Sequence, residues 1–167
     1  MAIPEKYYFK DDGNIPNSTL PLLLYKNVLS ETGNTGATWL ENRFAKNNWT
    51  NSWRNGIFSY HHYHSITHEV LGVYEGNAFV HFGGEKGSKI RVESGDVIVI
   101  PAGVGHKKLE SSADFAVVGA YPNGSDYDIL TGKPEERKKT QGNISKIPVP
   151  ESDPIFGRND GLLKLWR

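Results

Sequence analysis

Two histidines close together in the sequence have the spacing of a metal-binding pair. His62 and His64 are separated by one residue, so on a β-strand their side chains point to the same face, about 6–7 Å apart. Two imidazoles at that separation can bind one ion. A His-x-His pair by itself is more often an exposed strand pair than a ligand pair, so this interpretation requires a further ligand on the same face.

Glu69 supplies such a ligand if the chain turns after Ser65 and Glu69 begins a new strand. A two-residue hairpin loop at Glu75-Gly76 would pair the flanking strands. Counting back through that loop predicts an interior face made of Glu69, Leu71, Val73, Ala78, Val80 and Phe82. A lone carboxylate among apolar side chains is destabilising or becomes protonated. A metal ion shared with the two histidines removes this penalty and favours a metal site.

The same assignment of faces places the other nearby histidines outside the site. His61 and His81 fall on the outer face, and His68 falls in the turn, where a slip of one residue would bring it inward. Tyr60 shares the strand face of His62. We therefore treat Tyr60 as a candidate substrate contact, with a buried core tyrosine as the alternative.

A further histidine follows the apolar run Val97–Ile100. Pro101 and Gly103 are suited to ending that strand, because proline has a fixed φ and glycine a permissive one. His106 then begins the next strand, and Lys108 shares its face if the strand is regular. Lys108 is a candidate contact for a charged substrate, and an ion pair with Glu110 at the rim is the alternative.

The whole chain of 167 residues is expected to form one domain. Short runs rich in Val, Ile, Phe and Tyr alternate with glycine-containing turns over residues 56–121, which is typical of an antiparallel barrel or sandwich. Residues 1–55 are predicted to form an N-terminal arm with a helix at about 38–47. Residues 122–167 are predicted to be a C-terminal extension that packs on the barrel, with helical turns after Pro134 and a possible strand over 144–149.

Composition excludes several classes of function. The chain has no cysteine, which removes disulfides, thiolate metal sites and cysteine nucleophiles. Nineteen basic and nineteen acidic residues give a formal net charge of zero, which favours neither nucleic acid nor an anionic membrane. The N-terminus lacks the pattern of a signal peptide, and no apolar run approaches a membrane span. We expect a cytoplasmic protein without membrane or nucleic-acid partners.

The types and spacing of these residues resemble the two sequence motifs of the cupin superfamily. Its first motif matches at Gly56, His62, His64, Glu69 and Gly76, and its second at Gly95, Pro101, Gly103 and His106, with Glu110 in place of a final Asn. The resemblance implies an all-β fold, an antiparallel double-stranded β-helix that forms a jelly-roll barrel. It also implies that His62, His64, Glu69 and His106 bind a metal ion. The chain is similar to an uncharacterised bacterial branch of the superfamily, so the substrate stays open.

Three imidazoles and a carboxylate suit Fe²⁺, Mn²⁺ or Ni²⁺, with Zn²⁺, Co²⁺ and Cu²⁺ as further options. The first hypothesis is a metal-dependent oxygenase, of dioxygenase type, acting on a small chelating molecule. The second is a metal-dependent isomerase, epimerase or lyase of a sugar or small acid, which would need a general base. The third is a non-catalytic cupin that binds a small ligand. Exposed sheet edges also suggest a homodimer.

Overall fold

The computed structural model describes residues 3–167, apart from the side chain of Gln141. Nine strands lie in this part of the chain: β1 (Glu5–Phe9), β2 (Ser18–Tyr25), β3 (Trp49–Asn55), β4 (Glu69–Glu75), β5 (Asn77–Phe82), β6 (Ser88–Glu93), β7 (Val97–Ile100), β8 (His106–Ser111) and β9 (Ala116–Pro122). The helical elements are α1 (Gly33–Lys46), η1 (Pro134–Glu136), α2 (Arg137–Ile144) and α3 (Leu162–Leu165). Among the described residues, no helix is both long and apolar enough to cross a membrane.

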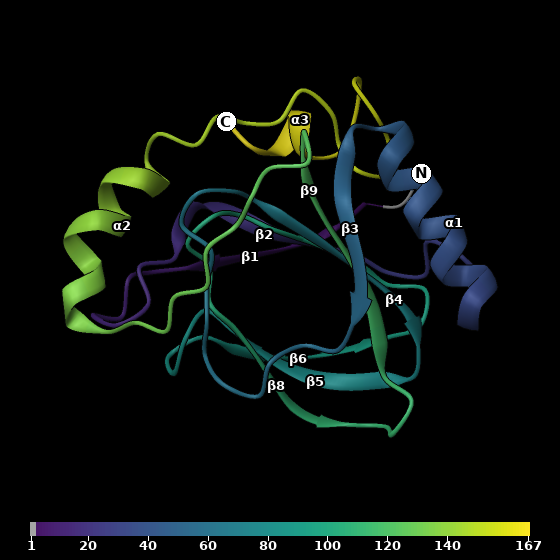
Figure 1. Ribbon diagram of the computed structural model, residues 1–167, viewed down its shortest axis with the longest axis horizontal. Coiled ribbons are helices and arrows are strands. Elements are labelled where there is room, and N and C mark those ends of the chain that lie inside the picture. The colour runs from purple at the N-terminus through teal and green to yellow at the C-terminus, as the bar shows by residue number, and fades with distance from the viewer. Residues whose placement is uncertain (1–2) are drawn as a thin grey trace.

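The strands form two antiparallel sheets, as expected for a jelly-roll barrel. The larger has the order β1-β2-β7-β4-β9-β3 and the smaller the order β6-β5-β8. In Figure 1 the small sheet runs along the lower part of the molecule, below the strands of the large one. Side chains from both sheets form one buried cluster between them, which includes Leu22, Leu71, Val80, Phe82, Ile98 and Val117.

Strands β4 and β5 follow one another at Gly76 but lie in different sheets. The hairpin pairing predicted from the sequence is therefore wrong, because β4 pairs with β7 and β9, and β5 with β6 and β8. The predicted inward faces are nevertheless correct, since Leu71 and Val73 share the buried cluster with Val80 and Phe82. Alternation along a strand determines which side chains face inward, whereas it carries no information about the partner strand.

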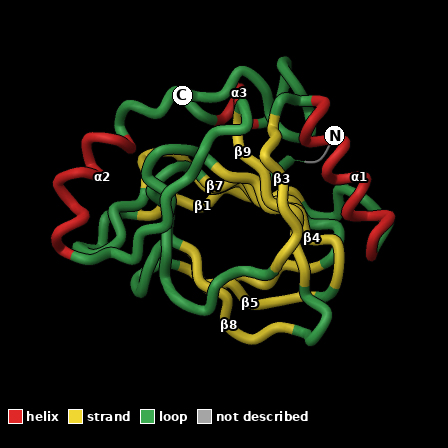
Figure 2. The backbone as a smooth tube through the Cα atoms, viewed as in Figure 1, coloured by secondary structure: helices red, strands yellow, loops and turns green. Residues whose placement is uncertain are grey.

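A second apolar layer covers the outer face of the large sheet. Helix α1 packs against β3, β4 and β9, and Figure 2 shows that the helices lie outside the strands. Gly72 makes this close packing possible, because a Cβ there would lie 2.7 Å from the side chain of Leu40. Trp166 is also buried in this layer and donates its indole N–H to the carbonyl of Pro21 at 2.8 Å.

Four further sequence-based expectations require correction. Residues 1–55 are more than an arm, because they supply β1, β2 and β3 of the large sheet, and α1 begins at Gly33 rather than at about 38. Residues 56–64, which include the strand expected to carry His62 and His64, form an irregular segment with isolated bridges at His62 and Tyr63. The possible strand over 144–149 is absent, since helix α2 reaches Ile144 and no strand follows it in the described residues.

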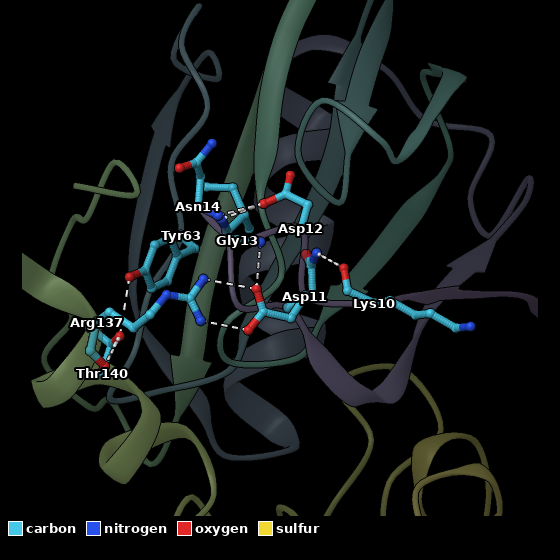
Figure 3. Close-up of polar contacts among 10 residues, drawn as sticks. Lys10, Asp11, Asp12, Gly13, Asn14, Tyr63, Arg137 and Thr140 are labelled. Carbon is cyan, nitrogen blue, oxygen red and sulfur yellow. Dashed lines mark hydrogen bonds and ion pairs between the residues drawn. The ribbon is translucent and has the colours of Figure 1, made fainter. Parts of the chain in front are cut away.

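The C-terminal extension is tied to the N-terminal part beside the irregular segment. In Figure 3 the guanidinium of Arg137 on α2 points at the carboxylate of Asp11, to which it donates two hydrogen bonds of 2.6 and 2.8 Å. The hydroxyl of Tyr63 donates to Thr140 at 3.3 Å. The first contact joins α2 to the N-terminal part, and the second joins it to the segment that carries the predicted histidine pair.

Candidate metal centre

The structure brings together the three histidines that the sequence selected. His62 and His106 form an antiparallel bridge, in which His106 donates its N–H to the carbonyl of His62 at 2.9 Å. This pairing places the two rings 4.0 Å apart. One ring nitrogen from each of His62, His64 and His106 lies within 4.8 Å of the other two, and all three side chains are buried. The group could therefore bind a metal ion.

Main-chain carbonyls orient all three rings in the same way. The Nδ1 atoms of His62, His64 and His106 lie 3.0, 2.5 and 3.1 Å from the carbonyl oxygens of Tyr60, Asp128 and Val104, respectively. A carbonyl can only accept, so each Nδ1 carries a hydrogen, and Nε2 is the ring nitrogen that each histidine could offer to a metal ion. Fixing the tautomer through the second ring nitrogen is the usual arrangement of histidine ligands in metal sites.

Glu69, the first residue of β4, lies at the same point. Its Oε1 atom is 3.3 Å from Nε2 of His64 and 3.4 Å from Nε2 of His106. Donor atoms that share an ion at about 2.0–2.2 Å are separated by about 3 Å, so these distances fit a common ion. Burial opposes the charged form of Glu69, but the imidazoles of His64 and His106 hold the pKa of its carboxyl well below the usual range.

The surroundings shift the pKa values of His62 and His64 in opposite directions. Burial and the neighbouring His106 lower the pKa of His62 to about 3, so His62 is neutral at pH 7. Burial also acts against the charged form of His64, yet the carboxylate of Glu69 raises the pKa of His64 above its ordinary value. A divalent ion would replace the proton that His64 and Glu69 favour in its absence.

A cavity of about 400 Å³ opens over these four residues. Its other lining residues are Trp53, Arg54, Asn55, Gly56, Ile57, Phe58, Leu71, Lys108, Tyr121, Tyr127 and Ile129. Trp53 donates its indole N–H to the hydroxyl of Tyr121 at 2.8 Å, and Tyr121 stacks on Tyr127 with ring centroids 4.7 Å apart. Burial, together with the charge of Glu69, raises the pKa of Tyr121. The wall beside Glu69 is thus aromatic and neutral.

The remaining candidates divide between the cavity and its surroundings. Lys108 lines the cavity, and no ion pair joins it to Glu110 within the described residues. Tyr60 is 45% exposed and does not line the cavity, although its ring stacks on Phe58, which does. His68 is buried away from the centre, between the N–H of Ala102 and the carbonyl of Pro148. Sequence reasoning missed Trp53, Tyr121 and Tyr127, for which no motif or spacing gives a signal.

Comparison with known proteins shows which family this chain belongs to. The family model described as Cupin matches residues 49–131. An uncharacterised protein of Bacillus subtilis (strain 168), YjlB, is 50% identical over 163 residues, which cover 97% of this chain and 96% of that protein. This chain belongs to the cupin family.

Several solved structures resemble parts of this cupin, with low sequence identity and low TM-scores. Procruciferin, an 11S globulin from Brassica napus, is 19% identical, with a TM-score of 0.40 over 59% of this chain and 31% of that one. Acireductone dioxygenase from Bacillus anthracis, with cadmium in its active centre, is 16% identical, with a TM-score of 0.39 over 50% and 57% of the two chains. This cupin spans less than two thirds of either protein. A DUF861 family protein from Thermotoga maritima is 23% identical, with a TM-score of 0.32 over 55% and 92%.

Proposed function

We propose that this cupin is a metal-dependent enzyme of oxygenase type that acts on a small chelating organic molecule. His62, His64, Glu69 and His106 would hold one divalent ion. The observation that carries the proposal is the orientation of the three imidazoles, each with Nδ1 bonded to a main-chain carbonyl, around a buried carboxylate at the base of a cavity. The fold itself thus orients the imidazoles and the carboxylate for binding a metal ion.

The donor set suits Fe²⁺, Mn²⁺ or Ni²⁺ best, and Zn²⁺, Co²⁺ or Cu²⁺ also fit imidazole and carboxylate donors. When bound, such an ion supplies Lewis acidity and, if it is redox-active, electron transfer to dioxygen. The protein contributes imidazole rings that are oriented by main-chain carbonyls, a buried carboxylate, and aromatic cavity walls that limit the access of water.

The charges around the cavity favour an anionic substrate. One divalent ion and Glu69 leave a net charge of about +1, and Lys108 adds a second positive group at the wall. Arg54 also lines the cavity, but its guanidinium already binds the carboxylate of Glu41 at 2.7 and 2.9 Å. We therefore assign Lys108 to the binding of a carboxylate or enolate oxygen.

An isomerase or lyase would need a general base next to the ion. Among the described residues that line the cavity, Glu69 is the only carboxylate, and it belongs to the proposed ligand set. Because the pKa of Tyr121 is raised, its hydroxyl stays protonated at neutral pH and offers no phenolate to act as a base. These observations favour the oxygenase over the isomerase.

The test is elemental analysis of tag-free protein purified without chelator, combined with oxygen uptake in the presence of chelating keto acids and enediols. We expect about one metal ion per chain, lost in His62→Ala and His106→Ala. Glu110→Gln, an exposed change on the same strand as His106, is the matched control and should keep the metal. Metal retained in both histidine variants would reject the ligand set. Bound metal without oxygen uptake would favour a binding role.

A further inference from the structure

A second group of possible metal ligands lies on the outer side of the small sheet. His81 on β5 contacts His61 from the irregular segment, with ring centroids 5.0 Å apart. Glu85, in the turn between β5 and β6, places Oε1 2.9 Å from Nε2 of His61. One ligand atom from each of these residues lies within 4.8 Å of the other two. None of them belongs to the inner centre.

The hydrogen bonding of this group is incomplete. Nδ1 of His61 is buried and has no hydrogen-bond partner. Within the part of the chain that the structure describes, the ring nitrogens of His81 form no hydrogen bond either, but they are not among its buried unpaired atoms and so remain accessible to solvent or to a ligand. Buried polar atoms are almost always paired in native proteins. One buried unpaired nitrogen of His61 and the unbonded imidazole of His81, both beside a carboxylate, therefore point to a missing ligand.

We propose that His61, His81 and Glu85 form a second metal site, which takes a borderline divalent cation such as Zn²⁺, Ni²⁺ or Cu²⁺. Two imidazoles and one carboxylate match the preferences of these ions, whereas Mg²⁺ and Ca²⁺ prefer oxygen donors throughout. Glu85 is the adjustable ligand, because its side chain is 74% exposed and can move the short distance that ligation requires.

The neighbouring charges make this site weaker than the inner one. Lys89 on β6 and Lys107 on β8 are the cross-strand partners of His81, and both are positively charged. Like charges disfavour a bound cation, although they also disfavour protonation of His81. An ion at this position would join the irregular segment to the β5–β6 turn, one residue away from His62.

The test is a Zn²⁺ titration of tag-free, chelator-treated protein, followed by calorimetry and by histidine-detected NMR. We expect two ions per chain, with the ring signals of His61 and His81 shifting on addition of the weaker one. His61→Ala and Glu85→Ala should each remove that ion and leave the tighter one. Glu135→Ala, which deletes an exposed carboxylate elsewhere, should keep both ions.

Two further variants make the result decisive. Lys89→Gln should tighten the weaker ion several-fold, because it removes a like charge while leaving every proposed ligand in place. His62→Ala should remove the tighter ion and keep the weaker one, which separates this proposal from that of the inner centre. A second ion that survives both His61→Ala and Glu85→Ala, or ring signals of His61 and His81 that do not shift, would overturn the assignment.

Discussion

Nδ1 of His64 lies 2.5 Å from the carbonyl oxygen of Asp128, which is 64 residues further along the chain. The carboxylate of Asp128 also accepts hydrogen bonds from the N–H of Ser65, at 2.7 Å, and from its hydroxyl. Asn143 on α2 donates to the same hydroxyl at 3.3 Å. The loop after β9 and helix α2 therefore position a residue of the candidate metal centre.

Removing the carboxylate of Asp128 should weaken metal binding without removing a ligand. In Asp128→Ala the carbonyl remains, but the loop loses its bonds to Ser65 and the ring of His64 becomes less well oriented. Changes in such supporting groups typically reduce metal affinity about 10–100-fold. Competition with a chromophoric chelator measures this change. Asp126→Ala, an exposed substitution in the same loop, should leave the affinity unchanged, and equal affinities in both variants would contradict the prediction.

Gly119→Ala should disturb the aromatic wall of the cavity. A Cβ at this position would clash with the indole of Trp53, so the ring must shift and its hydrogen bond to Tyr121 is disturbed. Overpacking of this kind costs about 1–3 kcal/mol of unfolding free energy. Denaturant unfolding and the tryptophan emission spectrum measure the two effects. Gly142→Ala is the matched control, because a Cβ there meets nothing within 4 Å, and the change should be neutral or slightly stabilising in a helix.

The stability of the protein should rise with pH between about 4 and 6.5. His68 accepts a hydrogen bond from Ala102 on Nδ1 and contacts the carbonyl of Pro148 through Nε2, which requires the neutral ring. Burial lowers the pKa of His68 to about 4. The unfolded state therefore binds a proton in this range that the folded state does not, so acid favours unfolding. One proton over this range corresponds to about 3 kcal/mol.

The variant His68→Gln isolates this contribution. Glutamine can accept from Ala102 and donate to Pro148, but it does not titrate. Denaturant unfolding of chelator-treated protein at several pH values should give a shallower slope for the variant, with the difference largest near pH 5. His62, whose pKa is also lowered, contributes with the same sign in both proteins and cancels in the comparison. Parallel slopes would show that folding does not lower the pKa of His68.

Trp166→Ala should be among the most destabilising single changes in the C-terminal extension. The indole is 2% exposed, packs against the ring of His68 and donates to the carbonyl of Pro21. Truncating a buried tryptophan costs about 3–5 kcal/mol. Thermal unfolding should show a large fall in Tm, whereas Arg167→Ala at the exposed neighbouring position should have little effect. A small change in Trp166→Ala would mean that the C-terminal end contributes little to the fold.

The ligand candidates could be predicted from the sequence because their signals are local. The spacing of His62 and His64, and the alternation that follows Glu69, are properties of short segments. They still converge although residues 56–64 form no strand, because an isolated bridge joins His62 to His106. The residues that support the candidate ligands could not be predicted in this way. Asp128 and Trp53 reach the centre through contacts between distant segments, about which the sequence of either segment carries no information.

The order of strands in the large sheet also has a consequence for how the protein is made. Strand β7 lies between β2 and β4, so β2 leaves the ribosome long before its neighbour exists. Pairing across such sequence separations is slow, because a long loop must close before any contact forms. Until β7 emerges, one edge of β2 stays unpaired and open to aggregation. A nascent chain halted before residue 97 should thus depend on chaperones far more than the full-length protein does.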